Sequence, residues 1–243
     1  MDGNFEAYSY TNSSERIKDI LNQPAGVFEE VDGLPDRDKL SFTNGFYGMC
    51  SAVFIDIRDS SGLTDKHKRP TLAKIYRAFI SEMVAVLNSD PYVREVNIVG
   101  DCVWAVYKTT QKTDIDDVFS LATKANTLID LLNHHYGKKG IDPLSIGIGV
   151  DYGRVLMIKA GYSGSGINEV VYMGDVVNRS AHLAHEAGRG WGTPPIFVGD
   201  VFHQNLKDEN RALLTSRYVS GLGTVYAGTV VNIAMNAWVE SQQ

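Results

Sequence analysis

The chain has 243 residues, of which 44% are hydrophobic and 21% are charged, so it can bury the core of one ordinary globular domain. Its formal net charge of -6 argues against a basic surface for nucleic acid or membrane, and no run approaches the ~20 apolar residues of a membrane span. The two cysteines lie in apolar runs, which is typical of reduced thiols, and the N-terminus lacks the pattern of a secretory leader. We therefore expect a cytoplasmic protein that binds neither nucleic acid nor membrane.

Residues 1–45 are polar and punctuated by glycine, proline and aspartate, which favours an N-terminal extension that packs on the domain or on a partner subunit. Within this extension, residues 14–21 predict a short helix, and the turn-rich sequence VDGLPDRD follows. Residues 46–243 are expected to form a single domain.

The apolar spacing of that domain predicts alternating strands and helices. The expected elements are a buried strand at 50–57, an amphipathic helix at 72–87, a hairpin of strands at 93–99 and 102–107, an amphipathic helix at 115–136, and strands at 144–150 and 155–160 joined by a turn at 151–153. A short strand from residue 172, a helix at 176–186 and strands near 196 and 230 complete the chain. This order predicts an α+β, ferredoxin-like antiparallel sheet with helices packed on one face.

Two aspartates are placed where this fold brings them together. Asp56 ends the first strand, and Asp101 occupies the tip of the neighbouring hairpin. Because adjacent strands lie about 5 Å apart, the two carboxylates can share one site, and oxygen ligands are those that Mg²⁺ prefers. The alternative is that both residues only fill turns, where aspartate is common.

Four segments resemble, in order and spacing, the signature blocks of class III adenylate and guanylate cyclases. They are VFIDIRDSSGLT (53–64), VNIVGDCVWAVY (96–107), SIGIGVDYGRV (145–155) and VVYMGDVVNRSAHLAHEAG (170–188). The resemblance implies that residues 46–243 form a class III cyclase catalytic domain. It also implies a phosphorus–oxygen lyase that closes a nucleoside triphosphate into a 3′,5′-cyclic monophosphate and releases pyrophosphate by two-metal catalysis.

By this resemblance, Asp56 and Asp101 are the paired ligands of two divalent cations, Mn²⁺ or Mg²⁺, and the main-chain carbonyl of Ile57 is a further ligand. One cation is expected to activate the ribose 3′-hydroxyl, and the other to hold the triphosphate while pyrophosphate leaves.

The turn that follows is the expected phosphate-binding segment. Free main-chain N–H groups at Ser60, Ser61 and Gly62 can bind phosphate oxygens, and Arg58 can add positive charge. The alternative is that a turn rich in serine and glycine is only a turn.

The last signature block carries the groups expected to contact the transition state. Asn178 matches the family asparagine that orients the ribose. Four residues later the family usually has an arginine, but this chain has His182, whose charge near neutral pH depends on its surroundings. Asn178, His182 and Arg58 are therefore the candidate catalytic residues.

The positions that read the base match neither purine pattern. Adenylate cyclases have lysine and aspartate, and guanylate cyclases have glutamate and cysteine, where this chain has Asn97 and Val171. Asn97 can donate and accept hydrogen bonds, but the Val171 side chain can do neither. The chain resembles the stand-alone cyclases of Pycsar antiphage defence, which make cyclic pyrimidine nucleotides. This resemblance places Tyr47 and Met173 in the substrate site with Asn97 and Val171, and favours UTP, giving cyclic UMP, over CTP.

The resemblance also implies a head-to-tail homodimer with composite sites, in which one chain supplies the metal ligands and its partner supplies the base and Asn178 positions. A separate cyclic-nucleotide-binding effector is expected to read the product and to cause abortive infection. Two alternatives stay open: a cytidylate or adenylate cyclase of the same fold, and a non-catalytic nucleotide-binding module. A diguanylate cyclase is disfavoured, because the hairpin lacks two glycines before an acidic pair.

Overall fold

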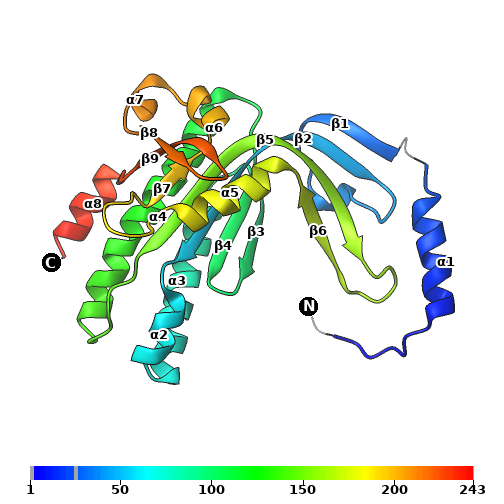
Figure 1. The fold of residues 1–243 in the computed structure, drawn as a ribbon, viewed down its shortest axis with the longest axis horizontal. Coiled ribbons are helices and arrows are strands. Elements are labelled where there is room, and N and C mark those ends of the chain that lie inside the picture. Colours follow the sequence, from blue (N-terminus) through cyan, green and yellow to red (C-terminus); the bar gives the residue numbers. More distant parts are fainter. Residues whose placement is uncertain (1–2, 25–26, 243) are drawn as a thin grey trace.

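The computed structural model describes residues 3–24 and 27–242 (Figure 1). Over these residues the chain forms one nine-stranded sheet with the order β3-β4-β2-β5-β7-β9-β8, while β1 pairs with β2 and β6 pairs with β5. The strands are β1 Phe28–Gly33, β2 Gly45–Ile57, β3 Val93–Val99, β4 Cys102–Lys108, β5 Ile146–Gly161, β6 Asn168–Met173, β7 Ile196–Val198, β8 Thr215–Val219 and β9 Gly223–Gly228. The helices are α1 Tyr10–Leu21, α2 Ser60–Lys66, α3 Arg69–Leu87, α4 Lys112–Gly137, α5 Asp175–Glu186, α6 Asp200–Asn205, α7 Asp208–Arg211, α8 Ile233–Glu240 and the short 3-10 helix η2 Arg37–Lys39.

The centre of the sheet has the ferredoxin-like order that the sequence predicts, in which β2, α3, β3, β4, α4 and β5 follow one another. Helices α3 and α4 bury the apolar residues that recur at helical spacing along them. Ile55 of β2, Phe79 of α3 and Phe119 of α4 are at most 1% exposed and belong to the same hydrophobic core. This core fixes the ends of β2 and β4, where Asp56 and Asp101 lie.

Strand β5 is longer than predicted. It runs without a break from Ile146 to Gly161, and it is paired with β2 along the whole of β2, from Ile57 opposite Ile146 to Gly45 opposite Ile158. The predicted turn at 151–153 is therefore wrong. Asp151 and Gly153 favour turns in isolation, but a complete partner strand holds both in extended conformation.

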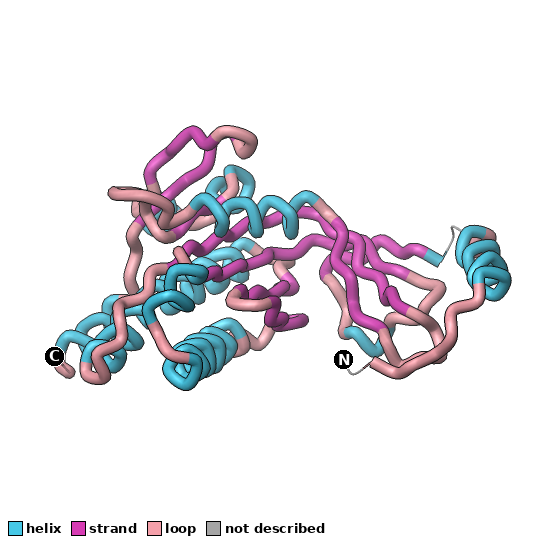
Figure 2. Tube along the Cα trace, turned by 60° about the horizontal axis from the view of Figure 1, so that its bottom comes forward, coloured by secondary structure: helices cyan, strands magenta, loops and turns pink. Residues whose placement is uncertain are grey.

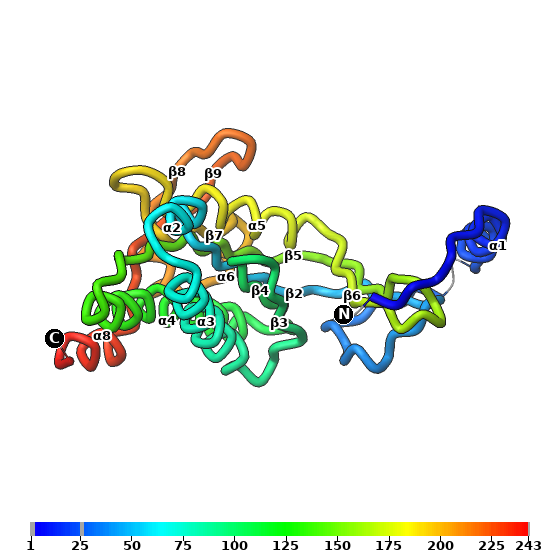
Figure 3. Tube along the Cα trace, turned by 90° about the horizontal axis from the view of Figure 1, so that it is seen from below, coloured from blue at the N-terminus to red at the C-terminus, as the bar shows by residue number. Residues whose placement is uncertain are grey.

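Helices cover both faces of the sheet, which corrects the expectation of one covered face. Helices α3 and α4 lie on one face and α5 on the other (Figure 3). Two glycines of β5 permit the close approach of α5, because a Cβ on Gly149 would lie 2.0 Å from the carbonyl oxygen of Ser180, and a Cβ on Gly147 would lie 2.3 Å from that of Ala184. The alternating sequence of β5 therefore presents glycines to α5 and isoleucines to the main core.

The outer halves of β2 and β5 continue beyond the helices (Figure 2). We call β1, residues 45–50 of β2, residues 153–161 of β5, and β6 the β arm. Helix α1 lies at the far end of this arm (Figure 1) and begins at Tyr10, four residues before the predicted start. Strand β1 is absent from the sequence-based prediction, because Val31 is its only partly buried apolar side chain. Its pairing with β2 shows that part of the N-terminal extension packs on the domain.

The C-terminal part adds the β8–β9 hairpin and helices α6, α7 and α8 to the predicted elements. The strand expected near residue 196 is β7, and the strand expected from residue 172 is β6, which begins at Asn168. The strand expected near residue 230 is wrong: β9 ends at Gly228, and the carbonyl of Val230 instead accepts a hydrogen bond from the side chain of Asn126. None of the described helices has the length and apolar character needed to cross a membrane.

Candidate active site

Asp56 and Asp101 lie at the same end of the neighbouring strands β2 and β4. Asp56 is paired with Cys102, the residue that directly follows Asp101 in the β3–β4 turn. Gly100 gives this turn its shape, with a left-handed φ of 63° that glycine adopts without strain. Burial raises the pKa of Asp56, and the negative charge of Asp101 raises it further, while Arg58 acts in the opposite direction. The two carboxylates are thus close enough to repel each other.

Arg58 is anchored beside Asp56. Its Nη2 atom lies 2.5 Å from Oδ2 of Asp56, its Nη1 donates to the carbonyl oxygen of His185 at 2.6 Å, and its side chain is only 7% exposed. Burial lowers the pKa of this guanidinium. Arg58 also lines a pocket of about 370 Å³, together with Asp59 and the loop at 188–190. Its first role is therefore to orient Asp56 and to join it to the end of α5.

The predicted phosphate-binding turn is a short helix. Residues Ser60–Lys66 form α2, which follows a left-handed residue, Asp59, with a φ of 53°. A Cβ on Gly62 would lie 2.9 Å from the carboxylate of Asp59, so glycine lets the first turn close over that side chain. Burial and the charge of Asp101 raise the pKa of Tyr76 of α3. Helix α2 starts at Ser60, shortly after Asp56 at the end of β2.

The donors at this end of β2 and β4 fit divalent cations. Two carboxylates are oxygen ligands of the kind that Mg²⁺ and Mn²⁺ bind, and their mutual repulsion favours a positive charge between them. In the described part of the chain, no cluster of three or more histidine, cysteine or acidic side chains has the arrangement of a complete metal site. Two protein carboxylates suit cations whose remaining ligands are phosphate and water oxygens. Ile57 is the last residue of β2, directly after Asp56.

Asn178 and His182 lie on the outer side of α5. They are one helical turn apart and both exposed, whereas Ser180 is buried and donates to the carbonyl of Ala52 at 3.1 Å. No hydrogen bond or ion pair among the described residues links Asn178 or His182 to either aspartate.

Arg179 does not replace the arginine that is missing at position 182. It faces inward, with Nε 3.5 Å from Asp151 and Nη2 2.7 Å from Asp200. Asp151 is 4% exposed, and burial raises its pKa to about 6. This charged network fixes the first half of α5 against β5 and α6. Sequence reasoning missed it, because the aspartate was assigned to a turn.

The predicted base-binding residues fall into two groups. Asn97 of β3 is paired with Trp104 of β4 and faces the α5 side of the sheet. Tyr47 and Met173 lie in one row across the β arm, because both are paired with Leu156. Their side chains project from the sheet face opposite to that of Asn97. The guanidinium of Arg154 lies 4.8 Å from the ring centre of Tyr47.

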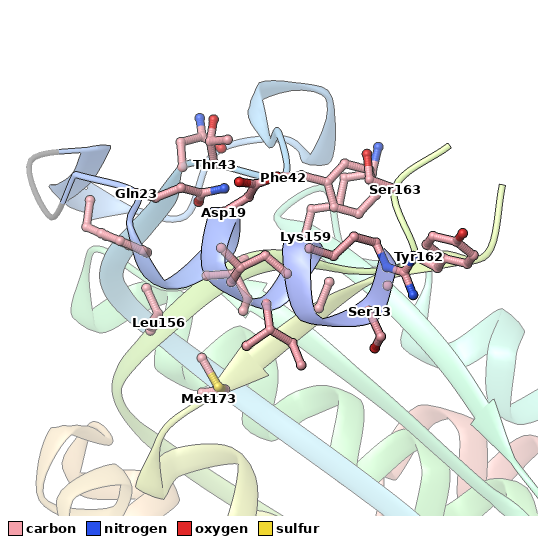
Figure 4. A pocket seen from close by; sticks show the side chains of 18 residues that line it. Ser13, Asp19, Gln23, Phe42, Thr43, Leu156, Lys159, Tyr162, Ser163 and Met173 are labelled. Atoms are coloured by element: carbon pink, nitrogen blue, oxygen red, sulfur yellow. The ribbon is translucent and has the colours of Figure 1, made fainter. Parts of the chain in front are cut away.

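Val171 lies on the same face as Tyr47. It is paired with Ile158, which is also paired with Gly45, and Gly45 and Tyr47 are two residues apart on β2. Met173 lines a groove of about 790 Å³ between α1 and the β arm, where its side chain points toward α1 together with that of Leu156 (Figure 4). A single chain therefore keeps Asn97 apart from Val171, Tyr47 and Met173.

The fold is that of a class III nucleotide cyclase catalytic domain. Residues 43–191 match the family model described as the adenylate and guanylate cyclase catalytic domain, and the chain belongs to this family. Among solved structures, the adenylyl cyclase CyaB from P. aeruginosa superposes with a TM-score of 0.62 at 18% identity over 76% of this chain and 95% of that chain. The guanylyl cyclase Cya2 superposes with a TM-score of 0.64 at 15% identity, over 77% of this chain and 95% of that one.

Three named relatives are more similar in sequence than these two structures. A uridylate cyclase of Gulbenkiania mobilis is 38% identical over the full length of both chains. A uridylate cyclase of Treponema porcinum is 34% identical over 96% of this chain and 81% of its own. A cytidylate cyclase of Staphylococcus aureus is 28% identical over 68% of this chain and 40% of its own.

Proposed function

We propose that the protein converts UTP into 3′,5′-cyclic UMP and pyrophosphate. The juxtaposition of Asp56 and Asp101 at the same end of neighbouring strands carries this proposal, in a chain whose whole length matches a uridylate cyclase. In the reaction, the ribose 3′-oxygen forms a bond to the α-phosphorus and loses its proton to solvent. The bond from the α-phosphorus to the bridging oxygen breaks, and pyrophosphate leaves with that electron pair.

Asp56 and Asp101, with the carbonyl of Ile57, would hold two Mg²⁺ or Mn²⁺ ions. Bound there, the cations would make the 3′-hydroxyl more acidic and neutralise charge on the leaving pyrophosphate. Arg58 keeps the Asp56 carboxylate in a fixed orientation through its bonds to Asp56 and to His185. Burial of Arg58 makes that orientation independent of substrate.

The remaining groups act on the triphosphate and ribose. Main-chain N–H groups at Ser60 and Ser61, at the start of α2, would bind phosphate oxygens, whereas the Gly62 N–H donates to the carbonyl oxygen of Asp59 at 3.0 Å. From the partner subunit, the amide of Asn178 would orient the ribose, and His182 would donate a hydrogen bond to the phosphate under attack.

The active form is a homodimer in this proposal. The exposed positions of Asn178 and His182, and their lack of bonds to the described Asp56 and Asp101, support sites composed of two chains. A head-to-tail arrangement gives two equivalent sites and closed two-fold symmetry.

UTP is favoured over CTP by the relatives. The two uridylate cyclases match at 38% and 34% identity over nearly all of this chain, whereas the cytidylate cyclase matches at 28% over 68% of it. A cytidylate or adenylate cyclase remains the rival within the same fold.

We further propose that cyclic UMP serves as a second messenger in cytoplasmic antiphage defence, where an effector protein binds it and stops growth of the infected cell. Phage plating on cells that carry the protein with its neighbouring genes tests this role. Protection that disappears with Asp56→Ala supports it, and equal protection by the inactive variant contradicts it.

The catalytic proposal is tested with purified protein, UTP and Mn²⁺, by measuring cyclic UMP and pyrophosphate together. Equal amounts of the two products, lost in both Asp56→Ala and Asp101→Ala, are expected. UTP binding without any cyclic product, in the wild type as in the variants, would instead identify a nucleotide-binding module.

A further inference from the structure

Three aromatic side chains form a rigid cluster beside Asn97. Trp104 of β4 is the direct cross-strand partner of Asn97 on one side and of Phe54 on the other. Its indole stacks on the Phe54 ring, with centroids 4.9 Å apart and an interplanar angle of 2°. Tyr172 of β6 contacts the indole edge-on, with centroids 6.3 Å apart and planes at 89°.

Burial differs within this cluster. Phe54 and Tyr172 are 9% and 6% exposed, whereas Trp104 is only partly covered. Two buried rings thus hold a third ring that is only partly buried. Stacked and edge-on contacts each add to the burial of the aromatic surface, so the indole has little rotational freedom.

Tyr172 is itself held by a buried acid. Its hydroxyl donates to the carboxylate of Glu95 at 3.0 Å, and the Glu95 side chain is 8% exposed. Arg37 of the N-terminal extension lies 3.5 Å from Glu95 and 3.0 Å from Glu169. Arg37 is thus shared between two carboxylates, and it ties the extension to the strand that carries Asn97.

Glu95 and Asn97 project from the same face of β3, because side chains alternate along a strand. Directly opposed residues in an antiparallel pair have Cβ atoms about 5 Å apart, so the clamped indole lies next to the Asn97 amide. A ligand that hydrogen-bonds to this amide meets a fixed aromatic surface beside it.

We propose that Trp104 is a specificity-determining residue, whose clamped ring limits the space in front of Asn97 to a single six-membered base, and that Tyr172 and Glu95 are positioning residues for it. This inference rests on the proposed function, in which Asn97 contacts the base. A pyrimidine fits beside the indole with its polar edge on the Asn97 amide. The fused second ring of a purine meets the indole edge.

The test compares Trp104→Leu, Trp104→Phe and Tyr172→Phe with the wild type and with Trp238→Leu. Trp238 is a partly exposed tryptophan of α8, remote from the cluster, and serves as the matched control. Calorimetry with α,β-methylene-UTP and α,β-methylene-ATP gives a ratio of dissociation constants. Product analysis with UTP and ATP gives a ratio of kcat/KM. Both ratios are independent of the fraction of protein that is folded.

Trp104→Leu is expected to reduce the preference for the uridine compound at least tenfold in both ratios, Trp104→Phe less, and Tyr172→Phe about threefold. Trp238→Leu should leave both ratios within twofold of the wild-type values. An unchanged preference in Trp104→Leu, or no preference in the wild type, would overturn the inference. A wild type that prefers the uridine analogue in binding but forms no cyclic product would refute the proposed function alone, because the ratio of dissociation constants still tests the role of Trp104.

Discussion

The guanidinium of Arg58 lies 2.5 Å from the carboxylate of Asp56, and it also binds the carbonyl of His185 at the end of α5. In the proposed dimer, α5 carries Asn178 and His182 toward the other active site. One buried side chain thus joins the metal-binding half-site of a chain to the helix that serves its partner.

Replacing Arg58 with glutamine should lower the free energy of unfolding by about 1–3 kcal/mol, because it leaves the half-buried Asp56 carboxylate without its cation. Activity should fall at least tenfold. Urea unfolding and initial-rate assays measure the two effects. Arg189→Gln is the control, since exposed Arg189 donates to the same His185 carbonyl, forms no ion pair with a described aspartate and acts on Asp56 only through its charge, and it should change stability by less than about 0.5 kcal/mol. Equal effects of the two substitutions would contradict the assigned role of Arg58.

The charge of Asp101 is expected to serve function at the expense of stability. Asp101→Asn removes the repulsion on Asp56, so the metal-free protein should gain a few tenths to about 1 kcal/mol of stability while catalysis is lost. Thermal unfolding without metal, then with Mn²⁺, checks this. Mn²⁺ should raise the Tm of the wild type and leave that of Asp101→Asn unchanged; an equal rise in both would exclude Asp101 as a ligand.

The close contact of α5 with β5 predicts a strong effect of one methyl group. In Gly149→Ala the added Cβ would meet the carbonyl oxygen of Ser180 at 2.0 Å and the nitrogen of Ala184 at 2.2 Å, both of them main-chain atoms that cannot rotate away. We expect a loss of about 3 kcal/mol or more, as overpacking in a rigid core produces. Gly137→Ala, at the end of α4 in open space, should instead be neutral or stabilise by up to about 1 kcal/mol. Chemical unfolding of both variants decides, and similar values would contradict the packing described for α5.

Asp151 should give the protein a distinctive pH dependence. Its native pKa of about 6 lies above the unfolded value of 3.8, so the folded state binds more protons between these values. Its contribution to stability is therefore fully present below about pH 4, and is lost as the pH rises through 6. The loss should amount to roughly 2–3 kcal/mol for this buried group. Urea unfolding from pH 4 to 7 should show a shallower decline in Asp151→Asn; parallel curves would contradict the raised pKa.

Composite sites predict complementation between two inactive variants. In a mixed dimer of Asp56→Ala and Asn178→Ala, one site carries both substitutions and the other carries neither. Mixing the variants under conditions that exchange subunits should therefore restore activity, up to half that of the wild-type dimer for each mixed dimer formed. A mixture of Asp56→Ala and Asp101→Ala should stay inactive, since each site then lacks one ligand. Activity in neither mixture would indicate that each chain completes its own site.

The central fold could be predicted from sequence, because the helical spacing of α3 and α4 and the Gly100–Asp101 hairpin are local signals. Strand β5 could not, since its turn-favouring residues are held extended by pairing with a distant strand. The packing face of α5 depends on Gly147 and Gly149, which only the register of β5 places beneath the helix.

The candidate site was predictable to a similar extent. The pairing of Asp56 with the Asp101 hairpin follows from the order of strands, and the structure brings the two together. The anchoring of Arg58 and the inward direction of Arg179 depend on side-chain contacts across distant elements, which sequence spacing does not encode. Asn97 and Tyr47 lie on opposite faces because side chains alternate along each strand, and their faces depend on the register of the continuous strand β5.

The most direct measurement is a competition assay, in which the purified protein acts on equimolar ATP, GTP, CTP and UTP with Mn²⁺ and the cyclic products are separated by mass. The account predicts that cyclic UMP exceeds each of the other products at least tenfold, and that Asp56→Ala forms none. A dominant cyclic purine, or cyclic UMP formed equally well by Asp56→Ala, would contradict it.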